Sequence, residues 1–437
     1  MNREKIGLAA ATAVGLGAII GAGIFTLSGT AIALAGDWAL FSFILVGIVA
    51  VIVALEIGEL TSLYPNLNGA AYSFVYEAFG SEMGFITGLL LYFSYASSIP
   101  VVALGFGSYL ASLLGLAPGD ADYFAIALIA VLTVVNLAGI RKVARADLGL
   151  VIVKILILMA VIGFTVLYVR DHGSATNFLA LKAPGTGASG VFSASVAVFF
   201  AYSGFQAIST FATNIEGGAT AAARAILLSV AISMALYVFI AASMLALVPA
   251  SKFTISADPL AFVVSSVRAP AYLLTVVDVG ALVATVSASL ALLLSSSRML
   301  RQIGLDGLLP KALRSYDEAR DVARNGVLVS ALIAVPMLYS GNIFVIAAIS
   351  NFGLLFSYLM SSLALVHFRR LGRMGSFRIP LYPYLPITAM VAVLAFIIGM
   401  PQQALVFGVV LMLVLLVVYY ALREYEEKEP VKVRFFD

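Results

Sequence analysis

The chain contains no cysteine and only two histidines among its 437 residues. Without cysteine it can form no disulfide, no thiolate metal site and no cysteine nucleophile. His172 and His367 are far apart in the sequence, so metal binding or acid–base chemistry by paired histidines is not expected. The HExxH pattern of zinc proteases and the GxSxG pattern of serine hydrolases are also missing. We therefore expect no enzyme active site, no metal site and no cofactor.

Charged residues are scarce as well, at 11% of the chain, whereas 62% of the residues are hydrophobic and the mean hydropathy is +1.08. This composition is that of a polytopic membrane protein. Apolar runs of about 17 to 25 residues can cross a bilayer as helices, because a helix makes its backbone hydrogen bonds internally. We expect twelve transmembrane helices, over residues 7–34, 37–62, 81–114, 121–139, 146–170, 189–213, 223–248, 267–302, 325–340, 343–367, 381–400 and 402–422.

The Lys and Arg residues are distributed unevenly about these spans. If the N-terminus is inside, most of them fall on the cytoplasmic side, as the positive-inside rule requires. The opposite side holds Arg170, Lys182, Lys252 and Arg268, and Lys154 lies within a span. We therefore expect a multi-pass plasma membrane protein with both termini in the cytoplasm. Because the cations are dispersed through short loops beside the bilayer, a nucleic-acid partner is not expected.

Two of the predicted helices are interrupted by small residues. The first contains GLGAIIGAGIF (Gly15–Phe25) and the sixth contains FFAYSGFQAIS (Phe199–Ser209). Glycines such as Gly17 and Gly21 can serve merely to let neighbouring helices approach closely. Interruptions at matching places in two halves, however, indicate discontinuous helices around a substrate site near the membrane midplane. The predicted organisation is a first repeat over residues 1–170, an inverted second repeat over 189–368, and two further helices with a tail over 369–437.

An interrupted helix exposes backbone groups that have no partner within the helix. This is costly in lipid unless a ligand or water satisfies them. Free N–H groups at the start of a half-helix attract an anion such as a carboxylate. Free carbonyl groups at the end of a half-helix attract an ammonium group or a metal cation. A free amino acid carries both charges a short distance apart, so one interrupted helix could hold it.

Four motifs resemble those of the amino acid–polyamine–organocation transporter superfamily. They are GAIIGAGIF in the first helix, GELTSLYPNLNGAAYSFVYEAFG (Gly58–Gly80), FFAYSGFQAIS followed by Glu216, and GLDGLLPKAL (Gly304–Leu313). The resemblance is greatest to the archaeal proton-coupled, broad-specificity amino acid transporters. It implies an all-α membrane protein with a sodium-symporter-like core of five plus five helices in inverted repeat, two C-terminal helices, and transport by alternating access.

The resemblance also implies which residues hold the substrate. The substrate carboxylate would meet the backbone N–H groups of Ala22, Gly23 and Ile24. Its amine would meet carbonyl groups of Ile19, Ile20, Phe200, Ala201 and Ser203, and Phe205 would lie beside it as a gate. Neither interrupted segment contains an acidic residue that would hold a cationic side chain, which favours neutral amino acids.

Lys154 lies in the middle of the apolar stretch LGLVIVKILILMAVI, about 10 Å along the fifth helix from its cytoplasmic start. Such a lysine can extend to the interface, or it can face the interior of the bundle and mark an ion pathway. The resemblance implies the second role, with the ammonium in place of a sodium ion, donating to the carbonyl of Gly17 and to the hydroxyl of Ser287, or of Thr285. Burial disfavours the charged form of an amine, so Lys154 is expected to couple transport to a proton.

Several alternatives stay open. Lys154 could be a fixed cation in an amino acid exchanger or uniporter, whereas sodium coupling is not expected because two cations would repel each other. A channel or an intramembrane enzyme is less well supported, since neither a selectivity filter nor a catalytic motif is present. Glu56 and Glu59 are expected to be solvated at the interface, and Tyr92 and Tyr95 could line the cavity. The sequence predicts neither the preferred amino acid nor the oligomeric state.

Overall fold

The computed structural model describes residues 6–65, 71–139, 147–183, 185–318 and 320–426. Within these residues the chain is helical, and β pairing is limited to two isolated bridges, Ile6–Ile215 and Asp317–Val322. The predicted all-α class is therefore confirmed. The α-helices are α1 (Leu8–Ile19), α2 (Gly23–Ala35), α3 (Ala39–Leu63), α4 (Ala71–Phe79), α5 (Ser81–Leu114), α6 (Ala121–Ala138), α7 (Asp147–His172), α8 (Ala188–Tyr202), α9 (Gly218–Leu247), α10 (Pro259–Ser266), α11 (Ala271–Leu305), α12 (Arg324–Met337), α13 (Ile343–Arg370), α14 (Tyr384–Ile398) and α15 (Gln402–Glu426).

Five 3₁₀ segments connect or extend these helices in the described ranges. They are η1 (Gly36–Trp38), η2 (Pro118–Asp120), η3 (Phe205–Asn214), η4 (Ala250–Lys252) and η5 (Lys311–Arg314). Of these, η3 is the long one, and it takes the place of the second part of the predicted sixth span, 189–213. The helices α4 and α10 were not predicted, because each is shorter than ten residues and neither forms a long apolar run.

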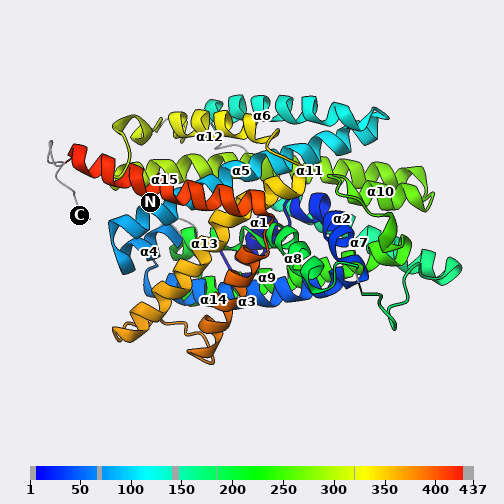
Figure 1. Ribbon diagram of the computed structural model, residues 1–437, viewed down its shortest axis with the longest axis horizontal. Coiled ribbons are helices and arrows are strands. Elements are labelled where there is room, and N and C mark those ends of the chain that lie inside the picture. Colours follow the sequence, from blue (N-terminus) through cyan, green and yellow to red (C-terminus); the bar gives the residue numbers. More distant parts are fainter. Residues whose placement is uncertain (1–5, 66–70, 140–146, 184, 319, 427–437) are drawn as a thin grey trace.

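Eight helical stretches of the described chain are long and apolar enough to cross a membrane, and four shorter apolar helices, α1, α8, α12 and α14, accompany them. The long helices run roughly along one direction, with α6 and α12 on one side of the molecule and α3 and α14 on the other (Figure 1). The helices α1 and α8 lie near the centre of this view, and α9 packs against α1 and α3 while exposing Leu228, Ile232 and Phe239 on its other face. The fold is therefore that of a multi-pass membrane protein, while the count of twelve spans and the inverted repeat stay predictions.

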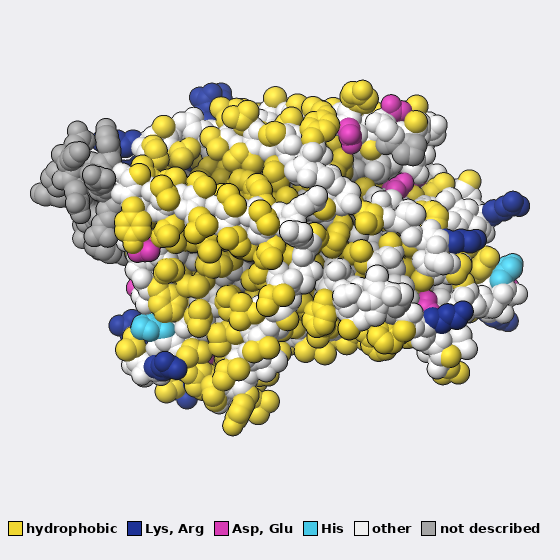
Figure 2. Space-filling model, viewed as in Figure 1, with side chains coloured by type: hydrophobic (Ala, Val, Ile, Leu, Met, Phe, Trp, Pro, Cys, Tyr) yellow, Lys and Arg dark blue, Asp and Glu magenta, His cyan; other side chains and the backbone are white. Residues whose placement is uncertain are grey.

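The surface of the bundle is apolar over its middle and carries charge toward its ends. Figure 2 shows hydrophobic side chains across the central part of this face, with most Lys and Arg side chains near the two ends of the long axis. Many polar side chains inside the bundle bond to the backbone of their own helix. Thr26, for example, donates to the carbonyl of Ala22 at 2.9 Å, and Ser195 donates to the carbonyl of Val191 at 2.8 Å. Such bonds satisfy hydroxyl groups where no water is present.

Candidate functional site

The first predicted interruption lies between α1, which ends at Ile19, and α2, which begins at Gly23. The first backbone bond of α2 runs from the Thr26 N–H to the Ala22 carbonyl, at 2.9 Å. The N–H groups of Ala22, Gly23 and Ile24 precede that bond, so they have no acceptor within the helix. Because the positive end of the α2 dipole is here as well, this turn can hold an anion such as a carboxylate.

The second interruption follows Tyr202, the last residue of α8. Gly204 has a φ of 108°, a left-handed conformation that glycine adopts without strain, and η3 begins directly after it. A Cβ on Gly204 would lie 2.5 Å from the carbonyl oxygen of Ala18, and a Cβ on Gly23 would overlap Cα of Ala201. The two interruptions therefore contact each other backbone to backbone, and each contact requires a glycine.

The carbonyl groups predicted to meet the substrate amine are joined by a tyrosine that sequence reasoning missed. Tyr237 of α9 is fully buried, and its hydroxyl lies 2.8 Å from the carbonyl oxygen of Ile19 and 3.1 Å from that of Ala201. The carbonyl of Phe200 accepts from the Ser203 hydroxyl at 2.7 Å. The carbonyl of Ile19 also accepts from the N–H of Gly21 at 2.7 Å, and that of Phe200 from the N–H of Ser203 at 3.3 Å. Since a carbonyl oxygen has two lone pairs, the carbonyl of Ala201 is the one of these three that can accept a further bond from an ammonium group without losing one.

A cavity of about 840 Å³ lies against both interruptions. This volume is within the range of small-molecule sites. The predicted site residues that line it are Gly17, Ile19, Ala22, Gly23, Phe200, Ser203 and Ser287. The other predicted residues, Ile20, Ile24, Ala201, Phe205 and Lys154, are buried but are not among the described residues that line it.

The predicted arrangement around Lys154 is present in part. Lys154 is 1% exposed, and its Nζ donates to Oγ of Ser287 at 3.3 Å. Thr285, the second choice, uses its hydroxyl within its own helix, bonding to the carbonyl of Ala281 at 2.8 Å. Gly17 lies close to α7, because a Cβ there would overlap Cγ2 of Val151. The structure therefore brings α1, α7 and α11 together at the lysine, whereas the bond to the Gly17 carbonyl stays a prediction.

Phe205, predicted as a gate beside the substrate, packs against α13. Its ring stacks on Tyr358 with ring centroids 5.5 Å apart and planes inclined by 23°. Phe199 also contacts Tyr358, at 5.9 Å between ring centroids. These contacts hold the end of α8 and the start of η3 against α13.

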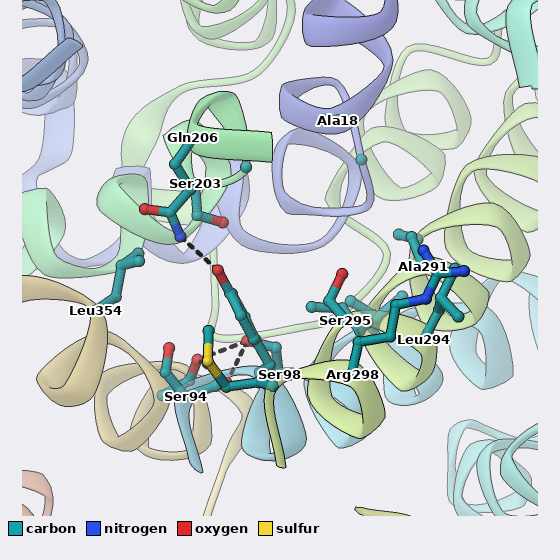
Figure 3. Close-up of a pocket in the computed structure, with 18 of the residues that line it drawn as sticks. Ala18, Ser94, Ser98, Ser203, Gln206, Ala291, Leu294, Ser295, Arg298 and Leu354 are labelled. Atoms are coloured by element: carbon teal, nitrogen blue, oxygen red, sulfur yellow. Dashed lines mark hydrogen bonds between the residues drawn. The ribbon is translucent and has the colours of Figure 1, made fainter. Parts of the chain in front are cut away.

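Polar side chains that sequence reasoning largely missed line the cavity from two facing sides, and we call them together the polar wall. The residues are Ser94, Tyr95 and Ser98 of α5, Gln206 of η3, and Ser350 and Asn351 of α13. Figure 3 shows Ser203 and Gln206 on one side of the cavity, facing Ser94 and Ser98 across it. Tyr95 was predicted as a possible lining residue. Tyr92 instead lies within hydrogen-bonding distance of Ser330, at 3.4 Å, and is not among the described residues lining the cavity.

The cavity extends from the interruptions to the C-terminal end of α11. There Arg298 pairs with Asp321 at 3.3 Å, and the side chains are 50% and 39% exposed, so this end reaches solvent. Arg301 lies over the ring of Tyr316, 3.9 Å from its centroid. Burial and the neighbouring Asp321 raise the pKa of the Tyr316 hydroxyl, which therefore stays protonated at neutral pH.

The opposite end is closed by packing among α2, α5 and α10. The Tyr109 hydroxyl donates to the carbonyl of Phe25 at 2.6 Å. A Cβ on Gly29 would overlap Cβ of Pro259, so α10 lies directly against α2. In the part of the chain that the structure describes, the cavity thus opens toward the C-terminal end of α11 and is covered at the other end.

Comparisons with known proteins identify the family of the chain. The family described as amino acid permease matches residues 11–428. The chain belongs to the amino acid permease family. Among its relatives, the branched-chain amino acid permease BcaP of Bacillus subtilis is 28% identical, covering 96% of this chain and 92% of the relative. The methylthioribose transporter of the same organism is 27% identical over 89% of this chain and 87% of its own length.

A solved structure shares the fold of this amino acid permease. A manganese transporter mutant of Eremococcus coleocola has a TM-score of 0.63 at 14% identity, covering 96% of this chain and 94% of that one. Family membership implies a multi-pass transporter of the plasma membrane, not an enzyme, with a small-molecule amino acid as substrate.

Two carboxyl groups of the permease are buried where interface solvation was expected. Glu56 is 0% exposed and Glu59 is 1% exposed. Glu59 pairs with Arg369 of α13, with Nε to Oε1 at 2.5 Å and the second nitrogen to Oε2 at 2.9 Å. Its Oε2 also accepts from the N–H of Ile379 at 2.7 Å. Glu56 accepts from the Ser362 hydroxyl at 2.5 Å. The expectation was wrong because α13 and the segment after it cover this end of α3.

Proposed function

We propose that this permease is a proton-coupled carrier of neutral amino acids that works by alternating access. Twelve spans, arranged as two inverted repeats of five and two additional helices, would supply the moving and the fixed parts. The cavity reaches solvent at the C-terminal end of α11, which the charge distribution predicts to be cytoplasmic. Both chain termini would lie on that same side. The conformation would then be inward-facing, with the outer side closed by α2, α5 and α10.

The observation that carries the proton coupling is the position of Lys154. Its side chain is fully buried in α7, and its ammonium contacts Ser287, which in turn lines the cavity. Burial disfavours the charged form of an amine, and a buried charge is expensive in a membrane, so such a group gives up its proton more readily than one in water. Loss of the proton would weaken the contact between α7 and α11 next to the α1 interruption, which links protonation to helix geometry.

The substrate contacts proposed at the interruptions are backbone groups, which supports a broad specificity. Any free amino acid offers the same carboxylate to the α2 N–H groups and the same ammonium group to the carbonyl of Ala201. That a relative is named a branched-chain amino acid permease supports a neutral substrate. The described residues lining the cavity include two arginines and one aspartate, which is paired with Arg298, so among them no carboxylate is left for a cationic side chain.

The test is uptake of labelled amino acids into proteoliposomes under an imposed pH gradient, with sodium absent. Lys154→Met should abolish gradient-driven accumulation. Lys154→Arg keeps a cation that is not deprotonated in proteins, so it should exchange substrate but not concentrate it. Lys182→Ala, which removes an exposed lysine, is the matched control and should behave as wild type. Accumulation at the normal rate by Lys154→Met would refute proton coupling through this residue.

Exchange is the second candidate, because a buried lysine can also act as a fixed cation. Uptake into proteoliposomes loaded with unlabelled amino acid distinguishes exchange from proton symport. If uptake requires internal substrate and ignores the pH gradient, the protein is an exchanger and Lys154 is structural. If the gradient alone drives accumulation, the protein is a symporter.

A further inference from the structure

The polar wall of the cavity is held in place by bonds among its own members. The hydroxyls of Ser98 and Ser350 lie 2.6 Å apart, joining α5 to α13. The hydroxyl of Ser350 also donates to the carbonyl of Ser94, at 2.9 Å. Because these serines satisfy one another, they present a rigid polar surface that needs no ligand to be stable.

Asn351 adds an acceptor to this wall. Its side chain is fully buried, and its Nδ2 donates to the carbonyl of Val196 at 2.6 Å. A carbonyl oxygen can only accept, so this bond fixes which end of the amide is the NH₂ group. The other end, Oδ1, has no hydrogen-bond partner among the described residues. Asn351 is among the residues around the cavity, so its Oδ1 is a buried acceptor beside the cavity whose hydrogen bond is not made by any described residue.

Gln206 of η3, which faces Ser94 and Ser98 across the cavity, adds a second amide. Its side chain is 2% exposed, and its Nε2 lies 2.6 Å from the Tyr95 hydroxyl. Its Oε1 has no partner in the described part of the chain, and Gln206 also lines the cavity (Figure 3). A tyrosine hydroxyl can donate as well as accept, so the free end of this amide can be a carbonyl or an NH₂ group. In either orientation Gln206 has one unused hydrogen-bonding end.

We propose that this wall favours, among neutral amino acids, those whose side chain ends in a hydrogen-bond donor, that is, an amide or a hydroxyl. This inference rests on the proposed function. The amides of Asn351 and Gln206 are the specificity-determining groups, and the interruptions hold the backbone part of every substrate. Asparagine, glutamine, serine and threonine belong to this class. Leucine and valine lack such a donor, so they should be carried more slowly even though the interruptions still hold their backbone groups.

The physical reason is the cost of leaving buried polar groups unpaired. An aliphatic side chain against this wall offers neither amide a bond, so Oδ1 of Asn351 and the unused end of Gln206 stay buried and unpaired. Each unmade bond lowers the relative affinity by a factor of about 5 to 150. A site built from hydrogen-bonding groups rejects a substrate that lacks the matching group far more strongly than an apolar site rejects an added hydroxyl.

The experiment measures wild-type uptake of near-isosteric pairs into proteoliposomes, threonine against valine and asparagine against leucine, at equal concentrations. The polar member of each pair should be taken up at least about tenfold faster. Equal rates, or faster uptake of valine and leucine, would overturn the inference while leaving amino acid transport intact. Uptake of no amino acid at all would instead refute the proposed function.

Three variants then assign the selectivity to residues. Asn351→Leu and Gln206→Met replace each amide with an apolar side chain of similar size, and each should bring the rate ratio of both pairs toward one while valine uptake persists. Asn136→Leu is the matched control, because Asn136 of α6 is also fully buried, its Oδ1 has no partner among the described residues, and it does not line the cavity. It should keep the wild-type ratio. Ratios unchanged in both cavity variants would overturn the assignment to these amides.

Discussion

Replacing Arg369 with glutamine is expected to destabilise the end of the bundle where α3 meets α13. The guanidinium supplies two of the three N–H groups that bond to the Glu59 carboxylate, the third being the backbone N–H of Ile379. The carboxylate is 1% exposed, so water cannot replace the lost bonds. The variant therefore leaves a buried negative charge with a single hydrogen bond, beside the second buried carboxyl of Glu56.

The magnitude follows from this burial. Removing one partner of a buried ion pair costs about 3–5 kcal/mol, because the other charge is left uncompensated. The side chain of Arg369 is 12% exposed, which places the expected loss for Arg369→Gln near the lower limit, at about 3 kcal/mol. In the double variant Glu59→Gln with Arg369→Gln no charge is buried at this site, and the new amide oxygen on α3 can still accept from the N–H of Ile379. Its loss should be smaller, about 1–2 kcal/mol.

The assay is denaturant unfolding in detergent micelles, analysed as a double-mutant cycle. The decisive comparison is between the double variant and Arg369→Gln alone, and the double variant should be the more stable of the two. Arg370→Gln, which changes the neighbouring exposed arginine, is the control and should alter stability by less than about 0.5 kcal/mol. If the double variant loses as much as the two single variants combined, the pair is not a coupled buried unit and the reasoning is refuted.

Three further predictions concern other parts of the molecule. Gly23→Ala should destabilise the protein by about 1–3 kcal/mol and lower uptake, because the added methyl would overlap Cα of Ala201; normal uptake and stability would contradict the close contact. Tyr237→Phe should cost about 1–2 kcal/mol in denaturant unfolding through the bond lost between the two interruptions, and an unchanged midpoint would count against that bond. Burial raises the pKa of the Asp258 carboxyl, so the folded protein keeps this proton to higher pH than the unfolded chain. The protonated Asp258 carboxyl therefore adds to the free energy of unfolding below about pH 4, and this contribution is lost as the pH rises through the folded-state pKa. Asp258→Asn should make the unfolding midpoint depend less on pH in that range.

The positions of the two interruptions could be predicted because their cause is local. Clustered glycines mark the first and a single glycine after a serine marks the second, and the helices end at Ile19 and Tyr202 as those residues indicate. The contact of Lys154 with Ser287 was reached through resemblance, since no periodic pattern distinguishes the inner face of a helix that is apolar all round.

Other features depend on tertiary contacts that no local pattern encodes. Tyr237 and Asn351 lie in apolar helices where a tyrosine or asparagine has many possible partners, and only the packing of distant segments decides which they meet. The burial of Glu59 requires the segment after α13 to fold back over α3. There Gly375 approaches so closely that a Cβ would overlap Oγ of Ser62. The run Phe205–Asn214 mixes apolar residues with glutamine, serine, threonine and asparagine, and this mixture does not distinguish a 3₁₀ segment from an α-helix.

The reciprocal contact of the two interruptions has a mechanical consequence. Gly23 lies against Ala201 and Gly204 lies against Ala18, each too closely to admit a methyl group, and one tyrosine hydroxyl spans both helix ends. Because the two interruptions are in van der Waals contact at both glycines, a tilt of one segment would require the other to move as well. On the proposed mechanism, a substrate that changed the angle of α2 by binding its first N–H groups would also move the end of α8, so binding at one interruption would turn both segments together.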